Sequence, residues 1–324
     1  MQPSQAQTRL NNISNSPPNS KPIEYPQICT IGTYVSSLYE LNLPDRSFGA
    51  DLMLWSNCTV PNVEPLSSIN FLNAKNLETN INSEQKRGKS YWTLMKVRGT
   101  FRFPWQLENY PFDRHVLNIA LEDKIRDVTL FSFQKDVEKS SCSPDINLKG
   151  WDVSQCKLDI NNLLYTTTFG DPELAGTGRS VYSRVNISLA LNRSSTISFF
   201  KLTTPVYVAL AIAAISFFLS PMEPPLMSGR MAILVGALFS VVLNMRSAES
   251  LLGRVDGLTL VDKVHLNTMI YIFIAALIAV ITRSMYKSRG EKYGKYTDRI
   301  TLPIFVLSYI AINFMLVESA KSIG

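Results

Sequence analysis

The sequence predicts an extracellular β-sandwich domain followed by a four-helix transmembrane domain. Up to about residue 196 the chain is polar, and its short alternating runs are separated by turn residues, a pattern typical of a sandwich. Residues 197–320 contain four apolar runs, each close to the ~20 residues that cross a hydrocarbon core. The 324 residues suffice for one domain of each kind.

The two ends of the polar half differ in composition. Residues 1–22 are rich in Pro, Ser, Asn and Gln and have no apolar core, so we expect a disordered lead. The sandwich is expected over residues 23–196. Its predicted strands are 33–41, 49–55, 90–103, 115–122, 127–133, 151–160 and 180–191.

The apolar half is predicted to form helices at about 199–219, 230–249, 260–285 and 300–320. The segment 286–299 has more basic than acidic residues, so we expect a short cytoplasmic loop there. An even number of spans then places the β domain and the C-terminus outside. We therefore expect a multi-pass protein of the plasma membrane, which is the inner membrane if the source is bacterial.

Composition argues against several function classes. The net charge is +6, but many cations lie between apolar segments, so no nucleic-acid partner is expected. We expect no enzyme, because there is no nucleophile elbow or phosphate loop, and no cofactor. Without a C-x-x-C pair, no metal site is predicted. A disulfide between Cys142 and Cys156 fits an oxidising compartment, although spacing alone leaves the pairing open.

The second apolar run is the least uniform. Small or polar residues recur in it at helical spacing, namely Ala232, Gly236, Ser240 and Asn244. Charged residues bracket it, namely Arg230, Arg246 and Glu249. Such a pattern fits either a helix-packing face or a helix that lines a water-filled path. A path of this kind would need several copies of the chain around one axis.

The segment "ENYPFDRHVL", residues 108–117, places a Tyr-Pro-Phe-Asp turn between two predicted strands. A plain hairpin would carry Gly or Asn in its turn. Tyr110 and Phe112 are instead apolar groups at a loop tip. We therefore expect another part of the protein to cover them.

This order of elements resembles the pentameric ligand-gated ion channels, the Cys-loop receptor superfamily, over about residues 23–320. The turn at 108–117 is similar to the family's signature loop, and Arg193, twelve residues before Pro205, matches an arginine–proline pair. The segment 250–265 is similar to the linker between the second and third helices. Phe103 and Leu117 replace the signature disulfide, so the chain resembles bacterial members.

The resemblance implies a symmetric homopentamer in a lipid bilayer. An agonist bound between neighbouring β domains would open a central pore for permeant ions, lined by the second helix. The implied gating interface comprises Asp45, Tyr110, Pro111, Phe112, Asp113, Arg193 and Arg254.

Two registers of the pore helix are open. The preferred pore face is Ala232, Gly236, Phe239, Leu243 and Arg246. The alternative face is Met231, Val235, Leu238, Val242 and Glu249. Glu223 and Arg230 are expected at the inner, selectivity-determining mouth. Cation conduction is preferred, with an anion-selective channel or a non-conducting, membrane-anchored binding protein as alternatives.

Aromatic residues are the candidates for the agonist site. They are Phe131, Phe133, Tyr165, Phe169 and Tyr182. An aromatic cage suits a cationic amine, whereas a proton or a divalent ion would need no cage. For Phe131 and Phe133 the sandwich core is an equally good interpretation.

Overall fold

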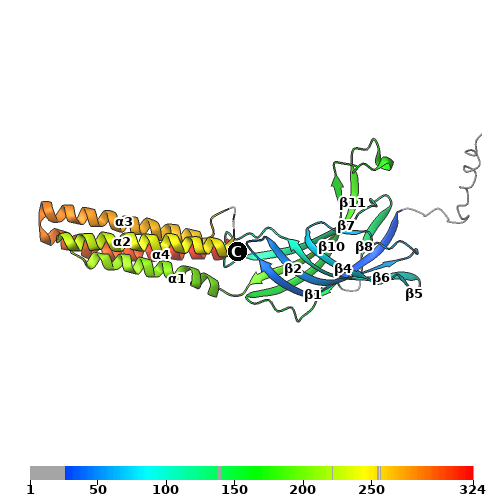
Figure 1. Ribbon diagram of the computed structural model, residues 1–324, viewed down its shortest axis with the longest axis horizontal. Coiled ribbons are helices and arrows are strands. Elements are labelled where there is room, and N and C mark those ends of the chain that lie inside the picture. The colour runs from blue at the N-terminus through cyan, green and yellow to red at the C-terminus, as the bar shows by residue number, and fades with distance from the viewer. Residues whose placement is uncertain (1–25, 137–139, 221, 254, 256, 324) are drawn as a thin grey trace, which may run out of the picture.

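The computed structural model has a β domain and a helical bundle joined end to end (Figure 1). It describes residues 26–323 except 137–139, 221, 254 and 256. The expected lead at 1–22 lies outside the described residues.

The β domain contains two sheets. The larger has seven strands in the order β4-β6-β2-β1-β8, with β5 on β6 and β9 on β1. These are β1 (Gln27–Asn42), β2 (Ser47–Cys58), β4 (Ala74–Ile81), β5 (Gln85–Arg87), β6 (Ser90–Arg102), β8 (Phe131–Lys135) and β9 (Ser141–Cys142). The four-stranded sheet has the order β10-β11-β7-β3. These are β3 (Ile69–Phe71), β7 (Arg114–Asp123), β10 (Trp151–Tyr165) and β11 (Ser180–Arg193).

Alternation along the strands forms the core between the sheets. On β7, Leu117, Ile119 and Leu121 are buried, whereas Val116 is exposed. Such period-two burial is expected where two sheets pack face to face. The core extends through both sheets, which confirms the predicted sandwich.

Two disulfides hold the β domain. Cys29 and Cys58 are direct cross-strand partners on β1 and β2. Cys142 on β9 bonds to Cys156 on β10 and so links the larger sheet to the smaller. The structure thus shows the Cys142–Cys156 disulfide, which residue spacing left open, and a Cys29–Cys58 disulfide, which the sequence did not predict.

Four helices of the described chain are long and apolar enough to span a membrane, which indicates a multi-pass membrane protein. They are α1 (Ile197–Ile215), α2 (Pro224–Leu252), α3 (Leu260–Arg289) and α4 (Glu291–Ile323), with the short 3-10 turn η2 (Ser216–Phe218) after α1. Proline at the start of α2 explains why this helix begins before the predicted residue 230, since proline is tolerated in a first turn.

The predicted loop over 286–299 is wrong. Helix α3 continues to Arg289, Gly290 ends it at φ 94°, and α4 begins at the next residue. Glycine adopts this left-handed conformation without steric cost. Glu291 and Lys295 form an i,i+4 ion pair that supports the first turn of α4.

Helices α1 and α3 lie between α2 and α4. Helix α2 packs against both of them, whereas α4 packs mainly against α3. At its far end α4 returns to the β domain, where the C-terminal label stands in Figure 1. There the Lys321 ammonium lies 5.7 Å from the centre of the Phe112 ring.

Candidate functional site

The Tyr-Pro-Phe-Asp loop between β6 and β7 lies at the junction of the two domains. Tyr110 and Pro111 are buried, and Phe112 is half-buried. The Arg193 guanidinium lies 4.6 Å from the centre of the Tyr110 ring. Together with the contact between Lys321 and Phe112, this covers the aromatic groups at the loop tip.

Asp113 is the centre of a buried charged cluster at this junction. Arg193, the last residue of β11, donates from Nε to Oδ1 at 2.7 Å and from Nη2 to Oδ2 at 2.9 Å. His115 Nε2 lies 2.7 Å from the same Oδ2. The guanidinium also stacks 4.0 Å from the Trp151 ring. These contacts hold the end of β11, just before α1, against the Tyr-Pro-Phe-Asp loop.

Opposing effects set the protonation of Asp113. Burial alone would raise the pKa of this carboxyl, but the hydrogen bonds from His115 and Arg193 and the Arg193 charge outweigh it. The pKa of Asp113 is therefore lowered from its ordinary value of 3.8. The carboxylate stays ionised, as a bidentate partner of arginine must.

The lowered pKa predicts how stability depends on pH. As the pH falls below 3.8, the unfolded chain binds a proton at Asp113 before the folded chain does, so this contribution to stability is lost. The difference in free energy of unfolding between wild type and Asp113→Asn should be largest at neutral pH and should become smaller in acid. Denaturant titrations across that range measure it, and a pH-independent difference would contradict the assignment.

One predicted member of the gating interface does not join this cluster. Asp45 lies on the exposed turn between β1 and β2, where it accepts from Lys75 at 2.5 Å and from Ser47 at 3.0 Å. Asp45 therefore does not contact Asp113 or Arg193, because a short exposed turn keeps it in solvent. Arg254 lies outside the described residues.

His115 and Trp151 are cluster members that the sequence did not identify. His115 follows Asp113 by two residues, and period-two alternation places both on one face of the chain. Trp151 is the direct cross-strand partner of Arg193 in the β10–β11 register. The Trp151 signal needs the strand register, which sequence alone does not supply.

Two loops of the β domain contact the linker between α2 and α3. A Cβ on Gly253 would lie 2.5 Å from Cα of Pro44, and Gly253 has φ +78°. A Cβ on Gly257 would lie 3.4 Å from Cγ of Glu108, in the loop after β6. At this junction lies a cavity of about 890 Å³, lined by residues that include Pro44 and Thr259. The β domain thus contacts the linker that follows α2.

Among the residues that the structure describes, helix α2 has one packed face and one face without a partner. Its buried residues are Met227, Arg230, Leu234, Ala237, Val241, Ala248 and Leu252. Directly opposite lies an exposed row, Ala232, Gly236, Phe239, Leu243 and Arg246. These are the residues of the preferred register. The alternative register lies to one side, with Met231 and Leu238 half-buried and Val235, Val242 and Glu249 exposed.

Arg230 is not at the inner mouth, contrary to prediction. It is 0% exposed, and its Nη1 and Nη2 donate to Asp298 of α4 at 3.1 and 3.0 Å. Thr282 also donates to Asp298, and the guanidinium lies 5.0 Å from the Phe217 ring. The reason is the helical phase, which places Arg230 on the packed face. Glu223, the other predicted residue, is exposed at the N-terminal end of α2.

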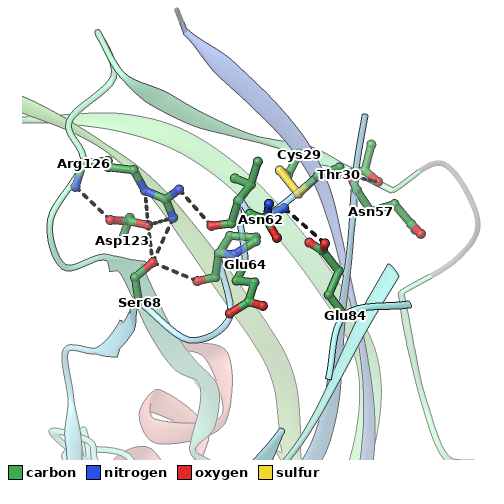
Figure 2. Close-up of a disulfide and its surroundings, with 12 residues drawn as sticks. Cys29, Thr30, Asn57, Asn62, Glu64, Ser68, Glu84, Asp123 and Arg126 are labelled. Carbon is green, nitrogen blue, oxygen red and sulfur yellow. Dashed lines mark hydrogen bonds and ion pairs between the residues drawn. A yellow bond between two sulfur atoms is a disulfide. The ribbon is translucent and has the colours of Figure 1, made fainter. Parts of the chain in front are cut away.

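Phe131 and Phe133 belong to the core, so their prediction as agonist contacts is wrong. Both point inward from β8 and are 0% and 4% exposed. The Arg126 guanidinium covers the Phe131 ring at 4.4 Å. Figure 2 shows how Asp123 and Ser68 hold that guanidinium.

The other three predicted aromatics lie on the ends of β10 and β11 and in the segment that joins them. Figure 1 shows this hairpin projecting from the β domain. Tyr165, Phe169 and Tyr182 contact one another with ring centres 5.2–6.0 Å apart. The Tyr165 hydroxyl bonds to Glu122 and Arg184. Burial and the Glu122 contact raise the pKa of Tyr165. Phe169 is 63% exposed, so the cluster is open to a ligand.

No family model matches this chain, and no curated protein matches its sequence.

Proposed function

We propose that this protein is a ligand-gated ion channel, in which several identical chains surround a pore lined by α2. The observation that carries the proposal is the direct contact between the β-domain loops and the linker that ends α2. Gly253 against Pro44 and Gly257 against Glu108 give the β domain a short mechanical route to one membrane helix. A mere membrane anchor has no need for such a route.

The unpartnered face of α2 supports the assembly. One chain presents this face on the side of the bundle away from α4, and one helix covers only part of a channel wall. Identical neighbours around an axis close the wall, and the resemblance to pentameric channels suggests five. In this arrangement α4 contacts lipid, since large apolar side chains cover its exposed surface.

An agonist would act through the aromatic cluster. Tyr165, Phe169 and Tyr182 lie on and beside the hairpin that joins β10 to β11. Strand β11 runs from that hairpin to Arg193 and into α1. A ligand that binds one position of the hairpin more tightly than another shifts the equilibrium between closed and open states by that difference in affinity.

Recording from planar bilayers tests the proposal. The purified chain should give single-channel steps that respond to acid, to a divalent cation or to a primary amine. Reconstituted oligomers that stay silent under all three conditions would overturn it.

Phe239→Ala is expected to increase current in the absence of agonist. Phe239 is 63% exposed at the middle of the unpartnered face, and a ring of such side chains closes a pore by dewetting. Leu238→Ala is the matched control on the neighbouring half-buried position. Leak from Leu238→Ala together with a tight Phe239→Ala channel would favour the alternative register.

A further inference from the structure

We infer that the proposed pore lined by α2 conducts anions in preference to cations. This inference rests on the proposed channel function and names the class of ion that crosses it. It departs from the cation preference drawn from the sequence, because the structure shows where each charge of α2 lies.

The charges of α2 are few, and they divide between its faces. Helix α2 itself carries Arg230, Arg246 and Glu249. Arg230 is fully buried and neutralised by Asp298, so it presents no charge on the exposed face. Within α2 itself, the exposed charges therefore lie at the other end of the helix, at Arg246 and Glu249.

Arg246 lies at the centre of the exposed face, and Glu249 lies at its side. At 100° per residue, Arg246 is about 20° from Phe239 around the helix, whereas Glu249 is about 80° away. Glu249 also lines the cavity between the domains, where Arg46 is a neighbour. The central row that Phe239 occupies thus carries a cation at its outer end and no carboxylate between Pro224 and Leu252.

Arg246 is free to act on a passing ion. Its side chain is exposed, and within the described chain it has no ion-pair partner. Each copy around the axis would add one guanidinium at the same level, and rings of Arg or Lys suit anion pores. Charge of one sign in a low-dielectric passage raises the local concentration of counter-ions.

The inner end of α2 adds little to this field. The positive end of the helix dipole lies at its N-terminus, close to the expected inner mouth. Glu223 precedes the helix there, but in the described structure its side chain makes no capping bond to the first turn. Ala232 and Gly236, the next residues of the central row, are uncharged. Pro224 and Pro225 have no N–H, and Met227 N–H donates to Glu223 O at 3.0 Å, so this end of α2 offers anions few free amide groups. Anion selection therefore depends on Arg246 at the outer end.

Reversal potentials test the inference directly. In tenfold asymmetric potassium chloride, wild-type current should reverse close to the chloride equilibrium potential. Arg246→Glu should move it toward the potassium potential, and Arg246→Gln should reduce the selectivity. Lys201→Glu makes the same charge change at an exposed residue of α1 and should leave the reversal potential unchanged.

The outcomes separate this inference from the function on which it rests. Wild-type current that reverses at the potassium potential would overturn anion selection but keep the channel. Absence of current under every condition would overturn the channel itself, and the inference with it. A reversal potential that Arg246→Glu does not change would mean that Arg246 faces lipid or a neighbouring subunit.

A thiol reaction gives a second readout that leaves Arg246 in place. All four native cysteines form disulfides, so Ser250→Cys introduces one free thiol a turn beyond Arg246. An anionic methanethiosulfonate should modify it at least about tenfold faster than a cationic reagent of similar size. Adding Arg246→Gln should remove the preference. Equal rates with Arg246 intact would contradict the inference.

Discussion

Arg193→Ala is expected to lower the free energy of unfolding by about 3 kcal/mol and to abolish agonist-evoked current. The side chain is largely buried, and its loss leaves the Asp113 carboxylate buried without its bidentate partner. His115 remains beside Asp113, which keeps the expected loss at the lower end of the range for a broken buried pair. The same change removes the guanidinium from the Trp151 and Tyr110 rings.

Denaturant titration in detergent, followed by tryptophan fluorescence, measures the stability, and bilayer recording measures the current. Lys75→Ala is the control, because it breaks the exposed pair with Asp45 near the same junction and should leave both unchanged. Arg193→Lys should recover the charge but not the forked geometry, so only part of the loss should return. Wild-type unfolding and gating in Arg193→Ala would refute the role of the cluster.

The sequence predicted the architecture well because it depends on local patterns. Alternation along a strand and the length of an apolar run are properties of consecutive residues, so the sandwich and the four spans could be read directly. The loop over 286–299 shows the limit of that approach. The charged residues of this segment predict a loop, but Lys, Glu and Arg are good helix formers, and Gly290 makes the turn between α3 and α4.

The candidate site was harder to predict because its contacts join distant segments. Asp113 and Arg193 were assigned to one interface only through the resemblance, since 80 residues separate them. Trp151 needed the strand register, and Asp45 was assigned only through the resemblance. Phe131 and Phe133 illustrate a further ambiguity, because an inward-facing aromatic pair on a strand looks the same in sequence whether it binds a ligand or fills a core.

The rotational orientation of α2 shows how one tertiary contact can decide which face of a helix is packed and which is exposed. The sequence placed Arg230 at a pore mouth because it begins an apolar run. Asp298, its partner, lies 68 residues later, in a segment predicted to be a loop. Once Asp298 is helical, it can reach the packed face of α2, and the row through Phe239 and Arg246 is left as the exposed face.

The ion pair between Arg230 and Asp298 is the basis of the second prediction with a large effect on stability. Asp298→Ala is expected to lower the free energy of unfolding by about 3–5 kcal/mol, because it leaves the guanidinium of Arg230 buried among helices without a carboxylate. Arg230→Met should cost less, because methionine carries no charge and fills much of the same volume. Thr282 would still donate to the remaining carboxylate in that variant.

The double variant Arg230→Met with Asp298→Leu separates the charge from the packing. Replacing a buried ion pair by apolar residues of similar volume is often neutral or stabilising, so the double variant should recover most of what Asp298→Ala loses. A coupling energy obtained from the full double-mutant cycle measures the pair itself. Additive losses would contradict a direct pair and would place Arg230 in water. The double variant should also conduct with unchanged ion selectivity, since the buried pair contributes no charge to the exposed face of α2.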